Sequence, residues 1–228
     1  MSIHEQENAL FAQWRSYLNA HNQHFIADGV VNEEEWKAAP RKTVFLLKET
    51  NSENYEWDER DYLNKYYSAG YHPAVVSKLA QWVDAVVLER EPKDWISVEG
   101  RTASLEAKTA LLRRVCWVNV KKTAGKGSVE QESYEEYWSH QENRDFLKAQ
   151  LALYSPDFII CCGTFDEYLD LYPELKDHTQ MTSRGLSFCL HGSIPVINHY
   201  HPGAFVKNYL LHYSLYDAIH EVMPTHSS

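Results

Sequence analysis

The chain has 228 residues, 44% of them hydrophobic, and a formal net charge of −10, which suits one domain with a substantial core. The acidic charge disfavours broad nucleic-acid binding, because phosphate contacts need basic residues, although one local basic groove is compatible with it. No apolar run is long enough to cross a membrane, and no signal peptide is recognisable at the start, so we expect a cytoplasmic protein.

The first quarter of the chain predicts two helices and one buried strand. Apolar side chains at helical spacing indicate a helix over residues 5–20. A short capped helix begins at Asn32 and stops before Pro40. Residues 43–47 form a compact apolar run, the first buried strand, and a polar turn follows it. Residues 52–72 are rich in tyrosine and tryptophan, and we interpret them as a long functional loop.

The middle of the chain predicts a second strand between helices. We expect a helix over 73–89, an irregular segment over 91–101 and a further helix over 103–113. Residues 115–120 are the second buried strand. This strand ends in a basic, glycine-containing loop at 121–127.

The last part of the chain continues the alternation of helices and strands. The predicted elements are one or two helices in 131–154, strands at 157–162, 186–190 and 195–199, and helices near 166–171 and over 204–222. Alternating strands and helices predict a three-layer α/β/α sandwich with a parallel or mostly parallel central sheet. We expect a single domain over 1–228 with a helical segment at about 1–40.

Polar residues follow three of the predicted strands. Glu49 and Asn51 follow the first strand, Asn119 lies in the second, and His199 and His201 close the last. Side chains past the carboxyl ends of strands in an open α/β sheet share one crevice. There a carboxylate can hold or deprotonate water, an amide can hydrogen-bond a ligand edge, and a histidine can donate to developing negative charge.

Four short segments at these strand ends carry the clearest motif signal. They are residues 44–51 (VFLLKETN), 117–122 (WVNVKK), 155–163 (SPDFIICCG) and 198–204 (NHYHPGA). In order and context they resemble the motifs of the uracil-DNA glycosylase superfamily, over about residues 43–206. The resemblance implies a uracil-DNA glycosylase-like domain that acts on DNA as a monofunctional glycosylase. We expect no cofactor, no membrane association and a monomer.

The resemblance also implies roles for particular residues. Glu49 would hold the attacking water and balance positive charge on the sugar, with Asn51 beside it. Asn119 would hydrogen-bond the flipped pyrimidine, and His201 would stabilise the departing base, with His199 as support. Three lysines would contact the backbone phosphates, namely Lys121, Lys122 and Lys126. Aromatic residues of the segment 52–72 would stack on an extruded base, and the candidates are Tyr55, Trp57, Tyr66 or Tyr67.

Several departures from the family pattern leave the target base open. Lys48 replaces the glycine that usually precedes the acidic residue, and no proline follows it. The aromatic segment 52–72 replaces the short loop that normally packs a phenylalanine on uracil. Candidate targets are therefore uracil, a damaged base or a hypermodified cytosine of phage DNA, in repair or in phage defence. The four cysteines lack the spacing of the iron–sulfur branch, so we predict no cluster and interpret them as reduced core residues.

Simpler interpretations and two other functions stay open. Glu49 could be a helix N-cap partner or a solvated loop acid, Asn119 could satisfy a turn, and His201 could be a satisfied buried histidine. The three lysines could form an ordinary exposed loop, and the aromatic segment could simply pack over the sheet. A non-catalytic DNA- or protein-binding module on the same fold is the main alternative function. A metal-dependent hydrolase using His199 and His201 is a weaker one.

Overall fold

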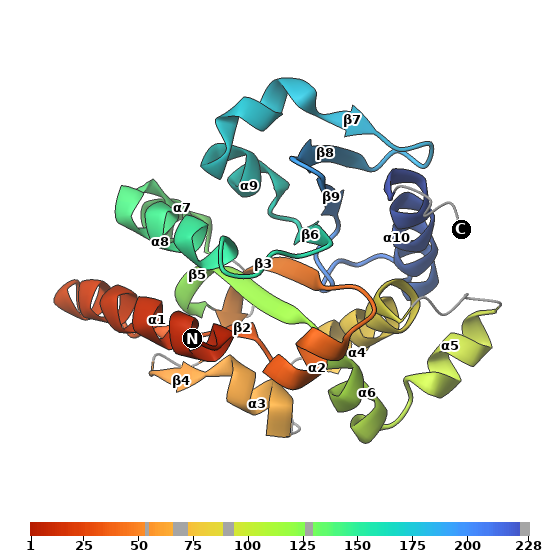
Figure 1. The fold of residues 1–228 in the computed structure, drawn as a ribbon, viewed down its shortest axis with the longest axis horizontal. Helices are drawn as coiled ribbons and strands as arrows, with labels where there is room; N and C mark the ends of the chain where they lie inside the picture. The colour runs from red at the N-terminus through yellow and green to blue at the C-terminus, as the bar shows by residue number, and fades with distance from the viewer. Residues whose placement is uncertain (53–54, 66–72, 89–93, 126–129, 224–228) are drawn as a thin grey trace.

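The computed structural model describes residues 1–52, 55–65, 73–88, 94–125 and 130–223, and one sheet runs through its centre (Figure 1). Within these residues the strands of that sheet are, in spatial order, β2 (Gly29–Val30), β5 (Cys116–Gly125), β3 (Thr43–Asn51), β6 (Phe158–Cys162), β9 (Ile194–His199), β8 (Ser187–His191) and β7 (Gln180–Met181). The neighbours β5, β3, β6 and β9 are parallel. The outer strands β2, β8 and β7 pair antiparallel. The predicted α/β class with a mostly parallel central sheet is confirmed.

Helices cover both faces of this sheet, and each face has its own apolar cluster (Figure 1). One face carries α1 (Ile3–Ala20), α7 (Gln131–Ser139), α8 (Gln141–Leu151) and α9 (Phe165–Leu171). The other face carries α4 (Pro73–Trp82), the π-helix η1 (Val83–Val87), α6 (Leu105–Leu112) and α10 (Asn208–Val222). Side chains alternate along β3, so Val44 and Leu46 enter the first cluster while Phe45 and Leu47 enter the second.

The other described elements are shorter. They are α2 (Glu33–Ala38), α3 (Glu59–Lys65), α5 (Trp95–Arg101), the 3₁₀ helix η2 (Pro173–His178), and the parallel strands β1 (Ile26–Ala27) and β4 (Trp57–Asp58). Within the described part of the chain, no helix combines the length and the apolarity that a membrane crossing requires. All four cysteines are buried and free, as expected for core residues.

Two of the predicted strands continue further than expected. We predicted a polar turn after residue 47 and a basic loop after residue 120, but β3 extends to Asn51 and β5 to Gly125. The two extensions pair with each other, and Glu49 lies opposite Lys121 in the parallel ladder. Their opposite charges make this polar continuation of the sheet favourable. The polar residues assigned to loops therefore lie within strands.

Other boundaries differ for local reasons. The described part of the expected loop 52–72 contains β4 and α3, because Leu63 on α3 packs into the core. The expected irregular segment 91–101 contains α5, whose first turn is capped where the Ser97 backbone N–H donates to Asp94 over 2.8 Å. The closing helix begins at Asn208 rather than at residue 204, since the Ala204 N–H donates to the His201 carbonyl over 2.8 Å and closes a turn.

Candidate functional site

Hydrogen bonds link the carboxyl end of β6 directly to β3 and to the carboxyl end of β9. The Thr164 hydroxyl, just after β6, donates to the Leu46 carbonyl of β3 over 2.7 Å. The Gly163 N–H donates to the His199 carbonyl of β9 over 2.8 Å. The chain passes from β3 outward to β5 and returns to β6 on the opposite side of β3. Ligands of open α/β sheets bind at such a reversal, so this edge is the candidate site.

Glu49 is the carboxylate at this edge. Its Oε2 accepts a hydrogen bond from Nζ of Lys121 over 2.8 Å, and the two side chains are 4% and 6% exposed. The same amine donates to Ser133 of α7 over 3.2 Å. Oε1 of Glu49 is buried and has no hydrogen-bond partner among the described residues. A buried carboxylate oxygen without a partner has capacity to accept a hydrogen from water or substrate.

Gly125 makes room for this carboxylate. A Cβ on Gly125 would lie 2.5 Å from Oε1 of Glu49, closer than such atoms approach in proteins. Glu49 therefore lies against the β5 backbone, and a side chain at position 125 would displace it.

His201 lies beside the end of β6. A Cβ on Gly163 would lie 3.6 Å from the Cβ of His201, which places the histidine against the turn that follows β6. Its Nδ1 accepts the Gly203 N–H over 3.0 Å, so the neutral ring carries its proton on Nε2. Lys78 of α4 donates to the Ala204 carbonyl over 2.8 Å and fixes the same loop. We call Glu49, Lys121 and His201 the edge site.

His199 is buried in the interior of the protein. Its ring packs against Trp82, with ring centroids 4.7 Å apart. Burial lowers the pKa of His199 to about 4, so the imidazole is neutral near pH 7.

Asn119 belongs to a separate group of polar side chains, which we call the buried network: Asp28, Thr50, Glu59, Asn119 and Lys122. The Asn119 amide donates to Glu59 over 2.7 Å and to Thr50 over 3.0 Å, and its backbone N–H donates to Asp28 over 2.8 Å. Burial, with a contribution from the Asp28 charge, raises the pKa of Glu59 to about 8. The Asn119 amide N–H groups are thus used inside the protein and link β5 to β3 and α3, instead of facing a base.

The two described lysines expected at phosphates lie elsewhere. Lys122 is fully buried and ion-paired with Asp28, and its amine lies 5.3 Å from the centre of the Trp14 ring. Lys121 pairs with Glu49. The expectation that Lys121 and Lys122 contact phosphates is therefore corrected, because both amines are buried and paired with carboxylates. Lys126 lies outside the described residues.

The two predicted stacking residues that the structure describes, Tyr55 and Trp57, have different surroundings. Trp57 lies edge-on to Tyr62, with ring centroids 5.7 Å apart, and its indole N–H donates to Ser52 over 3.3 Å. It is therefore a packing residue in this structure. Tyr55 is 52% exposed, and Asn51 is exposed at the end of β3. Tyr66 and Tyr67 lie outside the described residues.

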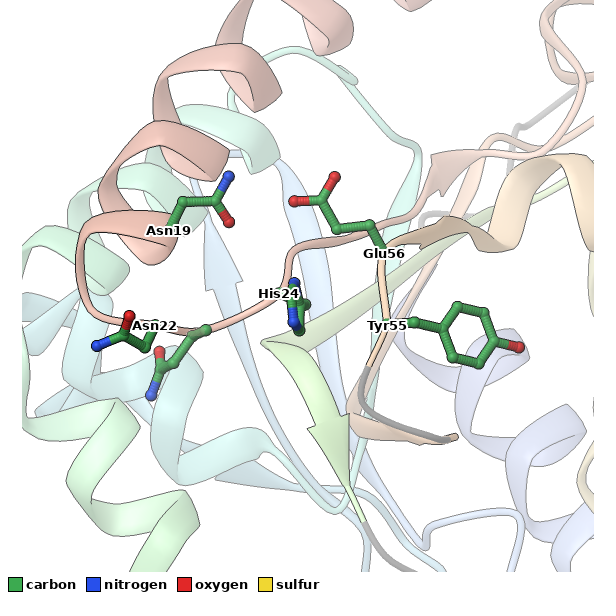
Figure 2. Close-up of a pocket in the computed structure, with 6 residues that line it drawn as sticks. Asn19, Asn22, His24, Tyr55 and Glu56 are labelled. Carbon is green, nitrogen blue, oxygen red and sulfur yellow. The ribbon is translucent and has the colours of Figure 1, made fainter.

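A polar groove lies near Tyr55, at the end of α1 (Figure 2). Its lining residues are Asn19, Asn22, Gln23, His24, Tyr55 and Glu56. In Figure 2 the Glu56 side chain extends toward Asn19, while the Tyr55 ring points to the other side. None of the edge-site residues lines this groove, so it is distinct from the candidate site.

The sequence analysis missed three residues that the structure singles out. Asp28 and Glu59 are the buried carboxylates around Asn119, and no local pattern marks either of them. Phe205 is fully exposed, on the loop that follows His201. Its signal was present, because an aromatic residue directly after a His-Pro-Gly-Ala turn has no packing partner nearby in the sequence.

The metal-dependent alternative has no ligand set in the described ranges, where no group of three His, Cys, Asp or Glu side chains could hold an ion. No family model, no curated protein and no solved structure matches the chain.

Proposed function

We propose that the chain is a DNA glycosylase of the uracil-DNA glycosylase type. It hydrolyses the N-glycosidic bond of a pyrimidine turned out of the helix and leaves an abasic site. The observation that carries the proposal is the edge site. The Oε1 of Glu49, which has no partner among the described residues, lies near the end of β3, and the oriented ring of His201 follows β9, with β6 between these two parallel strands. Uracil, a damaged base and a hypermodified cytosine are the candidate targets.

Glu49 positions the attacking water and provides the negative charge that stabilises the sugar. Hydrolysis of a glycosidic bond passes through a sugar with oxocarbenium character, which a nearby carboxylate stabilises. Lys121 holds Oε2, so Oε1 is the atom that accepts a proton from the attacking water. Gly125 keeps the carboxylate in this position.

His201 acts on the leaving base. Its Nε2–H donates to the base oxygen that gains negative charge as the bond breaks. The Gly203 N–H on Nδ1 selects this tautomer, and the Lys78 bond to Ala204 holds the loop in place. A fixed donor needs no reorientation during the reaction.

Phe205 fits the task of replacing the extruded base. Its ring is fully exposed, four residues after His201 along the same loop. Apolar side chains that enter the base stack help to unstack and bend DNA. Inserted there, the ring would offset part of the few kcal/mol that base flipping costs.

A non-catalytic DNA- or protein-binding module is the second candidate. The net charge of −10 favours it, and so does the internal pairing of Lys121 and Lys122, because both remove positive charge from a surface that would meet phosphates. This candidate predicts binding that is unchanged by Glu49→Gln and no base release.

Mass spectrometry of the bases released from DNAs of different composition tests the proposal. The panel contains uracil-substituted DNA, oxidised and alkylated DNA, and phage DNA with modified cytosine. We expect one base to be released by the wild-type chain and not by Glu49→Gln. Absence of any released base, with DNA binding intact, would favour the second candidate.

A further inference from the structure

Lys121 is an amine inside the edge site, and its task in base hydrolysis is limited to holding Oε2 of Glu49. It lies on β5 directly opposite Glu49 on β3. Its Nζ is 2.8 Å from the Glu49 carboxylate and 3.2 Å from the Ser133 hydroxyl. The carboxylate that would hold the attacking water therefore also contacts a primary amine, and one carboxyl group separates that amine from the water.

We propose that Lys121 is a nucleophile that forms a Schiff base with the abasic sugar, so that the chain also cleaves DNA at abasic sites. This proposal rests on the proposed function, because the sugar is placed beside Lys121 by the role of Glu49 at the sugar carbon. Lysine amines are established nucleophiles toward carbonyl groups when a neighbouring group takes their proton. This activity differs from the monofunctional glycosylase that the sequence resemblance implies.

Each step balances with Lys121, Glu49, the abasic sugar and water as the reacting groups. Glu49 takes a proton from the Lys121 ammonium, and the amine adds to the C1′ aldehyde of the ring-opened abasic sugar. Glu49 returns the proton to the resulting hydroxyl, water leaves, and a protonated imine forms. Glu49 then removes a C2′ proton, and the C3′–O bond breaks with its electron pair leaving on the 3′ phosphate. Water finally hydrolyses the unsaturated imine and releases the lysine.

The neighbouring lysines do not share this geometry. Lys122 is fully buried and paired with Asp28 in the buried network. The amine of Lys48 lies 5.2 Å from the centre of the Tyr134 ring. Lys121 is thus the described lysine that contacts the Glu49 carboxylate. Lys48, which directly precedes Glu49 in the sequence, provides a matched control.

Borohydride trapping on a preformed abasic site tests the proposal without requiring base release. Duplex DNA carrying one natural abasic site is incubated with the full chain and sodium borohydride, which reduces an imine to a stable amine. We expect a covalent protein–DNA adduct, with the adduct mapped to Lys121 by mass spectrometry of its peptides. Lys121→Arg keeps the positive charge beside Glu49 but has no primary amine, so its adduct should fall at least tenfold. Lys48→Arg should trap as the wild type does.

The outcomes separate this proposal from the glycosylase itself. Base release followed by alkali-dependent strand cleavage, with no borohydride adduct, would overturn the lyase role and leave the glycosylase in place. An adduct on Lys121 without any base release would support the lyase role and count against the glycosylase. An adduct mapped to another residue, or one unchanged in a folded Lys121→Arg, would also overturn the role of Lys121.

Discussion

The edge site and the buried network both include residues of β3 and β5, yet the polar groups of the two sites are satisfied differently. In the buried network, Asp28 accepts from Asn119, Gln150 and Lys122, and Asn119 donates to Glu59. In the edge site, one oxygen of Glu49 is left without a partner among the described residues. The carboxylates of the buried network are bonded within the protein and fix positions, whereas the unpaired carboxylate oxygen of Glu49 has capacity for a ligand. The neutral Oε1 of Gln150, beside Asp28, is also without a partner among the described residues. The type of residue at a strand end therefore does not decide its role.

Removing the central carboxylate of the buried network should have the largest effect on stability. Asp28→Ala leaves the Lys122 ammonium buried and unpaired, which costs about 3–5 kcal/mol in the free energy of unfolding. Urea denaturation of the full chain measures this. Asp170→Ala breaks the exposed pair with Lys176 and should cost no more than about 1 kcal/mol. Equal losses in the two variants would contradict a structural role for the network.

A methyl group at position 125 should disturb the edge site next. Gly125→Ala places a Cβ against the Glu49 carboxylate, and overpacking of this kind costs about 1–3 kcal/mol. We expect base release to fall more than stability does, because the carboxylate must move. Gly100→Ala, where a Cβ meets no atom within 4 Å, is the control. Wild-type base release in Gly125→Ala would show that the position of Glu49 is unimportant.

The buried network should also give stability a pH dependence. The folded pKa of Glu59, about 8, lies above its usual value of 4.5, so the folded chain keeps a proton that the unfolded chain releases. Stability is then lost as pH rises from about 5 to about 8. Glu59→Gln should remove this loss over the same range, measured by urea denaturation at several pH values. The exposed Glu99→Gln should retain the wild-type profile, and a Glu59→Gln profile identical to it would refute the assignment.

Phe205→Ala should change stability least of all, by less than about 0.5 kcal/mol, because the ring is fully exposed. Base release from duplex DNA should nevertheless fall on the order of tenfold, since unstacking a base step costs a few kcal/mol. Release from single-stranded DNA should change little. Equal losses on both substrates would show that Phe205 does not act by inserting into the base stack.

The sequence predicted those parts of the fold that local pattern controls. The apolar runs 43–47, 157–162 and 195–199 are strands because they are buried on both faces of a parallel sheet. The two-residue strands β1, β2, β4 and β7 were missed, since two residues carry no periodicity. The continuation of β3 and β5 into polar residues was also missed, because it depends on pairing between segments far apart in the chain.

The candidate site was predicted only in part, for a similar reason. Glu49 and His201 do lie at the ends of the central strands. Asn119 could not be assigned from sequence, because its partners Asp28 and Glu59 are 91 and 60 residues away. Lys122 looked like a surface lysine for the same reason, since its burial beside Asp28 is set by tertiary structure.

Base release by paired variants from the two groups tests the central contrast most directly. On the DNA that the wild-type chain attacks, Glu49→Gln and His201→Ala should each release base at least about a hundredfold more slowly, in protein that urea denaturation shows to be folded. Glu59→Gln, in the buried network, should keep its rate within a few-fold of wild type. A folded Glu49→Gln with wild-type base release, or a folded Glu59→Gln that has lost it, would contradict the division of this molecule into a chemical edge site and a structural network.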